Sequence, residues 1–198
     1  ITNQFFSTKN QMTRIQANLL LTFTALIWGS TFVVQQVATG GLGAIVFTSA
    51  RFFMGGLVVL PIACIQYARV QRTLKPITPK QWLGMVITGL VLFAAAVLQQ
   101  VGIFHTTVAN AGFLTALYVP LVPVFAFFVL KTRVHWSVWP SSVGCLVGTY
   151  IMSGAQSLHL STGDLWVISS ALFWAIHVLM VGIMATRTQA PLVVAAVQ

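Results

Sequence analysis

Long apolar runs separated by short polar gaps dominate this sequence. A helix that crosses a bilayer needs about 20 mainly apolar residues. Six runs qualify, at residues 17–38, 42–67, 82–104, 108–130, 136–153 and 165–184. They are continuous rather than alternating, and they are longer than the strands of a membrane β-barrel. The pattern therefore predicts an all-α, polytopic transmembrane helix bundle with six full spans.

Basic residues fall in alternate gaps between these runs, and Arg51, inside the second run, is the one exception. The gaps after the first, third and fifth runs contain no Lys or Arg. Positively charged loops stay in the cytoplasm. We therefore expect a multi-pass protein of the cytoplasmic (inner) membrane whose residues 1–16 form a cytoplasmic N-terminal segment. The basic residues of the other gaps are Lys9, Arg14, Arg69, Arg72, Lys75, Lys80, Lys131, Arg133 and Arg187.

The composition excludes several classes of function. Charged residues make up 6% of the chain, against about 25% in soluble domains. Because Asp164 is the single acid, paired-carboxylate catalysis and multi-carboxylate metal sites are excluded. Cys64 and Cys145 lie far apart inside apolar runs, so neither a disulfide nor a zinc site is indicated. We expect no enzyme activity, metal, cofactor or nucleic-acid partner; the net charge of +9 comes from residues between membrane spans.

A short motif occurs twice in the chain. Ala25-Leu26-Ile27-Trp28-Gly29 of the first run matches Ala171-Leu172-Phe173-Trp174-Ala175 of the sixth at an offset of 146 positions. The copies are five helices apart, so the second enters the membrane in the opposite sense. Inverted repeats are typical of secondary transporters, which bind substrate at the repeat interface near the midplane. We predict a first five-helix repeat at 17–153 and an incomplete second repeat at 154–198, giving six spans of an expected ten.

Several stretches resemble the EamA-like branch of the drug/metabolite transporter superfamily, whose members are ten-helix exporters. They are Ala25 to Phe32, Ala50-Arg51-Phe52, Gly102 to Pro123, Gly163-Asp164-Leu165 and Ala171 to Ala175. The resemblance covers nearly all of residues 14–198. It departs at Lys131-Thr132-Arg133, where family members often carry a Glu. The resemblance implies export of small metabolites across the cytoplasmic membrane.

Polar and aromatic residues concentrate in the outer half of the predicted membrane. At about 1.5 Å per residue, Gln35, Gln99 and Asn110 lie roughly 3–8 Å from the outer helix ends. Four more candidates lie roughly 14–15 Å from those ends, near the midplane: Trp28, Arg51, Tyr118 and Trp174. His177 lies slightly deeper. Gln35, Gln99, Gln100 and Asn110 either line an outward-opening cavity or join helices by hydrogen bonds. The predicted substrate pathway comprises Trp28, Gln35, Arg51, Gln99, Asn110, Tyr118, Trp174 and His177.

Four of these residues have two interpretations each. Arg51 has no intramembrane acid to pair with, so it either bonds helix ends and amides or contacts an anionic group of the substrate. Trp28 and Trp174 either pack at the repeat interface or line a path for zwitterionic or aromatic solutes. His177 is either hydrogen-bonded structure or a proton-coupling group.

Helix ends and interruptions supply further expectations. Asp164 follows Ser161-Thr162-Gly163 and is predicted to be a helix N-cap. Pro120 and Pro123 remove amide donors and should kink the fourth span, either as a gating hinge or as a bend that fits its neighbours.

The favoured function is that of a secondary transporter that exports or exchanges small metabolites, either amino-acid-like or drug-like solutes. No phosphate-binding glycine motif is present, so a gradient or facilitated exchange is expected to drive transport. The alternative is a non-transporting membrane scaffold, or a half-transporter that needs a partner chain. A small-molecule substrate and the lipid bilayer are the expected partners, with a homodimer or a missing second half as further possibilities.

Overall fold

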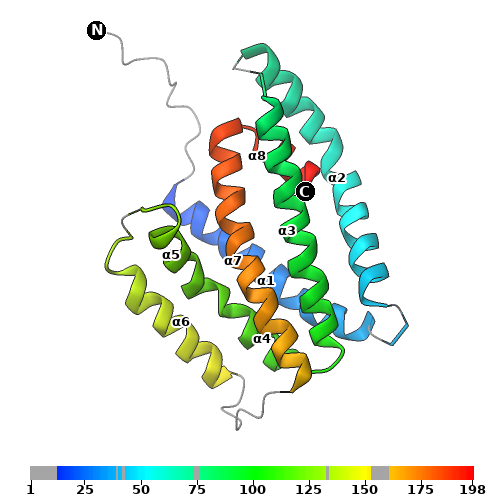
Figure 1. Ribbon diagram of the computed structural model, residues 1–198, viewed down its shortest axis with the longest axis vertical. Coiled ribbons are helices and arrows are strands. Elements are labelled where there is room, and N and C mark those ends of the chain that lie inside the picture. Colours follow the sequence, from blue (N-terminus) through cyan, green and yellow to red (C-terminus); the bar gives the residue numbers. More distant parts are fainter. Residues whose placement is uncertain (1–12, 39, 42, 74–75, 133, 153–160) are drawn as a thin grey trace.

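The computed structural model describes residues 13–38, 40–41, 43–73, 76–132, 134–152 and 161–198 (Figure 1). These residues form helices and no strand. The helices are α1 (Arg14–Ala38), α2 (Ala44–Thr73), α3 (Pro79–Ile103), α4 (Val108–Ala116), α5 (Tyr118–Phe128), α6 (Val138–Met152), α7 (Thr162–Thr188) and α8 (Pro191–Val197).

The predicted all-α polytopic bundle is confirmed, although not every span is of full length. Five helical segments are long and apolar enough to cross a membrane, α4 and α5 counting together as one. α6 occupies the fifth predicted run and is a shorter apolar helix. The predicted cytoplasmic segment, apart from residues 13–16, and most of the boundary between the predicted repeats, 153–160, lie outside the described residues.

Side chains in the sequence define where α3 and α7 begin. At α3, Thr78 accepts a hydrogen bond from the Gln81 backbone amide while the Gln81 side chain accepts from the Thr78 amide. At α7, Ser161 and Asp164 make the same reciprocal pair. This arrangement is a capping box. The expectation that Asp164 is the N-cap is therefore wrong: Ser161 is the cap, and Asp164 is the third residue of the helix.

α3 and α7 run antiparallel as the central pair, with α2 on one side and α4, α5 and α6 on the other (Figure 1). Two points of close approach bring α3 and α7 together. A Cβ on Gly84 would lie 2.7 Å from Met184 Sδ, and one on Gly163 would lie 2.5 Å from the His105 backbone carbon. The absence of side chains at these glycines therefore permits the contact.

Burial on α1 is reversed relative to a helix of a soluble protein. α1 contains one buried side chain, Gln35, whereas most of its apolar side chains are exposed. Thr48, Thr88, Gln99 and Gln100 are also buried. Apolar groups outside and polar groups inside are expected when lipid is the solvent.

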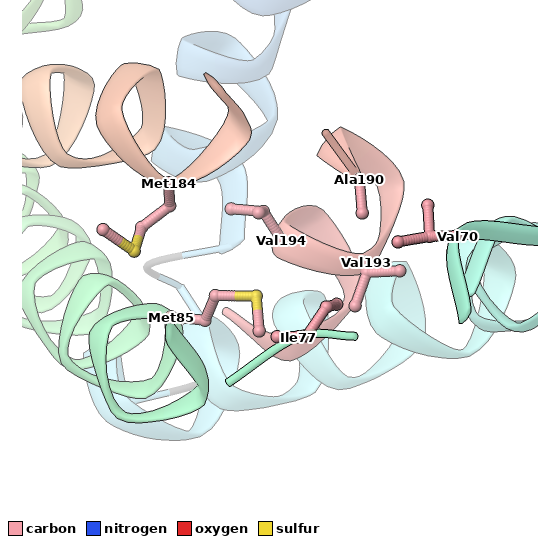
Figure 2. Packing of buried hydrophobic residues seen from close by; sticks show 7 residues of the cluster. All are labelled: Val70, Ile77, Met85, Met184, Ala190, Val193 and Val194. Atoms are coloured by element: carbon pink, nitrogen blue, oxygen red, sulfur yellow. The ribbon is translucent and has the colours of Figure 1, made fainter. Parts of the chain in front are cut away.

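Two apolar clusters mark the two ends of the bundle. One lies at the end where α2, α5 and α7 finish, which we call the basic end because Arg69, Arg72, Lys80, Lys131 and Arg187 lie there. In this cluster α8 packs side chains toward α2, α3 and α7 (Figure 2). It comprises Val70, Ile77, Met85, Met184, Ala190, Val193 and Val194. The second cluster, at the opposite end, comprises Ile103, Ala111, Leu114 and Val167.

Candidate substrate pathway

Four of the predicted pathway residues form one aromatic cluster in the middle of the bundle. The Trp28 ring on α1 lies 5.9 Å from Tyr118 on α5 and 5.8 Å from Trp174 on α7, centroid to centroid. Trp174 lies 5.8 Å from His177 in an edge-to-face arrangement. Aromatic pairs favour such tilted and edge-to-face geometries at these separations. We call these four residues the aromatic cluster.

An interruption in the fourth span positions Tyr118. α4 ends at Ala116 and α5 begins at Tyr118. Pro120 has no amide proton to donate to the Ala116 carbonyl, and its ring crowds that carbonyl, so a continuous helix is disfavoured there. Pro123 is buried inside α5. The predicted interruption of this span is present, and a hinge motion at Pro120 and Pro123 stays a prediction.

A hollow of about 190 Å³ lies beside Trp28 and Tyr118. Gly29 and Gly112 line this hollow on opposite walls. The space beside each of them is open, because an added Cβ would meet no atom within 4 Å. Each wall uses one helix face, with residues at i, i+3, i+4 and i+7. The lining residues are Ala25, Trp28, Gly29 and Phe32 of α1, and Gly112, Thr115, Ala116, Tyr118 and Val119 of α4 and α5.

Gln99, Gln100 and Gln35 join helices α1, α3 and α4. Gln99 Nε2 donates to Thr115 Oγ1 at 2.9 Å, which connects α3 to the wall of the hollow. Gln100 Nε2 donates to the backbone carbonyl oxygen of Gln35 at 3.3 Å. The side-chain oxygens of Gln35 and Gln100 are nevertheless buried without a partner in the part of the chain that the structure describes. Helix joining is therefore observed for Gln99 and Gln100, whereas cavity lining by these amides stays a prediction.

Asn110 lies elsewhere, near the start of α4. Its backbone amide donates to Thr107 Oγ1 at 3.2 Å, and its side chain interacts with the Asp164 carboxylate. That carboxylate also accepts a hydrogen bond from Thr106 Oγ1. Asn110 thus belongs to the junction between the α3–α4 turn and α7 rather than to the aromatic cluster.

Arg51 occupies a third place, on α2. Its guanidinium lies over the rings of Phe47 and Phe52, 5.5 and 5.1 Å from their centroids. Cation–π contacts of this kind stabilise a desolvated cation. Arg51 Nε is buried and has no hydrogen-bond partner among the described residues. This donor is available to a ligand oxygen.

Part of the wall of the hollow consists of residues outside the predicted pathway. Gly29, Gly112 and Thr115 line the hollow. The small residues Gly112, Thr115 and Ala116 share one helix face, and this spacing is the sequence feature that identifies the wall. No group of His, Cys, Asp or Glu able to hold a metal is found in the described residues.

Comparison with known proteins identifies the family. Residues 15–154 match the EamA-like transporter family, which is most of the chain. The chain belongs to this family. This EamA-like chain is also similar to an uncharacterized transporter of Archaeoglobus fulgidus, with 33% identity over 168 residues. The match covers 85% of the chain and 49% of the relative, so the chain spans about half the length of the curated relative that it matches. No solved structure matches this EamA-like chain.

Proposed function

We propose that this EamA-like protein moves small zwitterionic or aromatic solutes across the cytoplasmic membrane, by export or exchange, along a path that passes the aromatic cluster. The observation that carries the proposal is the contact between Trp28 and Trp174 beside the hollow. A tryptophan face attracts both aromatic rings and ammonium groups, so it suits such solutes. The open walls at Gly29 and Gly112 leave room for a ligand.

The inverted repeat predicted from the sequence, whose copies would be related by a two-fold axis, supports this location. Residues related by such an axis contact each other only close to it. Trp28 and Trp174 are equivalent at the offset of 146 positions, and their rings are in contact. At the same offset, Ala44 begins α2 and Ala190 directly precedes α8, and these helices also pack together. Transporters with this symmetry bind substrate at the repeat interface.

The proposed orientation places the basic end in the cytoplasm. The Lys and Arg side chains that define this end support it through the positive-inside rule. The opposite end of the bundle, which holds Asp164, then faces the outside, and the hollow lies toward the outer half of the membrane. The second half of the pathway would come from further helices of the same protein or from a partner chain.

Blocking the hollow tests the proposed path. The full-length protein is reconstituted in liposomes, and counterflow of a panel of radiolabelled solutes is measured, beginning with L-phenylalanine. Gly112→Phe fills the hollow, so counterflow should be lost. Gly144→Phe on α6 is the matched control, because a Cβ there also meets nothing within 4 Å. This control should retain counterflow.

The outcomes separate the competing functions. Loss of counterflow in both variants, or in neither, contradicts a path through the hollow. A folded wild-type protein that moves no solute of the panel contradicts transport and favours the scaffold alternative.

A further inference from the structure

His177 lies in the interior of the bundle, close to the middle of a membrane span. It is roughly 22 Å from the first residue of α7 and 16 Å from the last, at 1.5 Å per residue. Its exposed fraction is 8%. An ionisable side chain at this depth is energetically costly, so such residues are rare and usually belong to a functional site.

The two ring nitrogens of His177 have different surroundings. Nε2 lies 2.9 Å from Gln198 Oε1. An amide oxygen can only accept a hydrogen bond, so Nε2 carries the proton of the neutral ring. Nδ1 therefore presents a lone pair. This atom is buried and has no hydrogen-bond partner among the described residues.

Few other groups near His177 can exchange protons. Several elements pack against α7. Among their described residues, Arg14 lies at the start of α1, Lys80 at the start of α3 and Tyr118 at the start of α5, whereas α4 and α8 carry no titratable side chain. On α7 itself, Asp164 and Arg187 lie at the two ends. Histidine is the side chain that ordinarily changes charge near neutral pH.

The neighbours of His177 connect it to the proposed path. The Trp174 ring lies 5.8 Å away and can stabilise an imidazolium ion through its π system. Trp174 Nε1 is itself buried without a partner in the described part of the chain. A donor at Trp174 and an acceptor at His177, one helical turn apart, match a solute that carries both a hydrogen-bond acceptor and an N–H donor.

We propose that Nδ1 of His177 binds either a proton or the N–H donor of a solute. This exclusive binding couples the movement of protons in one direction to the movement of solute in the other. One lone pair cannot accept both, so a proton that binds Nδ1 converts imidazole to imidazolium and releases the solute. Loss of that proton on the other side of the membrane restores the acceptor. This inference rests on the proposed function, and it adds the coupling ion and the chemistry of the solute.

The test compares proton and solute movement in the same vesicles. Full-length protein is reconstituted with a pH-sensitive dye inside, and L-phenylalanine supplies the ammonium donor. Wild type should move protons against the flow of phenylalanine. His177→Gln keeps a hydrogen-bond acceptor but cannot titrate, so whatever phenylalanine movement remains should carry no protons. His105→Gln, in the turn between α3 and α4, should behave as wild type.

A second measurement does not depend on transport. Nitrogen-15 NMR of labelled histidine should show a neutral Nε2–H ring that is absent from the spectrum of His177→Gln, and added phenylalanine should shift its Nδ1 signal. Proton movement that persists in His177→Gln, or the opposite tautomer, overturns the inference. Phenylalanine counterflow without proton movement in wild type also overturns it while leaving the proposed function intact. A wild type that moves none of the solute panel contradicts the proposed function itself.

Discussion

Gln66 on α2 caps the start of α8: its Oε1 accepts the backbone amide of Leu192 at 2.8 Å, across 126 positions of sequence. The same oxygen accepts the Val193 amide at 3.3 Å. The first amides of a helix have no partner within the helix. In an apolar setting such amides are costly when unpaired, so one side chain fixes where α8 sits against α2.

Removing this cap should loosen α8. Gln66→Leu leaves two amides unpaired and should lower the free energy of unfolding by about 1–3 kcal/mol. Gln66→Glu keeps an acceptor and adds a favourable charge at a helix start, so it should retain stability. Unfolding in mixed detergent measures both variants, with Gln71→Leu on the same helix as the control. Equal stability of Gln66→Leu and Gln71→Leu would contradict a capping role.

The crossing of α3 and α7 should not tolerate a methyl group at Gly163. The added Cβ would lie 2.5 Å from the His105 carbon and 2.7 Å from the Gly102 oxygen, both in the backbone. Gly163→Ala should therefore cost about 1–3 kcal/mol of stability. Gly182→Ala, on the same helix with nothing within 4 Å, should be neutral or stabilising because alanine favours helix. Thermal unfolding in detergent compares them, and equal midpoints would refute the close crossing.

The hydrogen bond between Gln99 and Thr115 should be measurable as a coupling energy. A double-mutant cycle with Gln99→Leu and Thr115→Val should give about 0.6–1.7 kcal/mol, as for other hydrogen bonds between membrane helices. The free energies of unfolding of the four proteins supply the cycle. Additive effects of the two changes would show that the pair does not join α3 to α4.

Arg51 should matter most for solutes that carry a carboxylate. Its Nε is buried without a partner among the described residues, so a carboxylate is a fitting ligand. Arg51→Gln should slow counterflow of L-phenylalanine more than that of phenethylamine, which lacks the carboxylate. Arg51→Lys should recover part of the difference. A purely structural role would slow both solutes equally.

Topology is open to direct labelling. With Cys64 and Cys145 replaced by alanine, a single cysteine is placed at Gly40 or at Arg72. These positions lie at opposite ends of α2. An impermeant maleimide should reach the Arg72→Cys position from the cytoplasmic side and the Gly40→Cys position from the outside. Both positions labelling from one side would contradict the alternation of spans.

The sequence predicts the spans, except that α6 is shorter than expected, because the apolar runs alone determine them. It also predicts the meeting of Trp28 and Trp174, through the repeated motif. It does not predict that Asn110 and Arg51 lie apart from that pair, since depth along a helix says nothing of the direction in which a side chain points. The role of Gln66 was equally hidden, because its partners are backbone amides far along the chain.

The two contacts between α3 and α7 differ in stiffness. Near Gly163 backbone meets backbone, whereas near Gly84 the contact is the flexible side chain of Met184. Backbone atoms cannot yield as a thioether does. Any tilting of α7 against α3 therefore pivots beside Gly163 and has its greatest swing at the basic end, where α7 would move relative to α8, which Gln66 holds against α2.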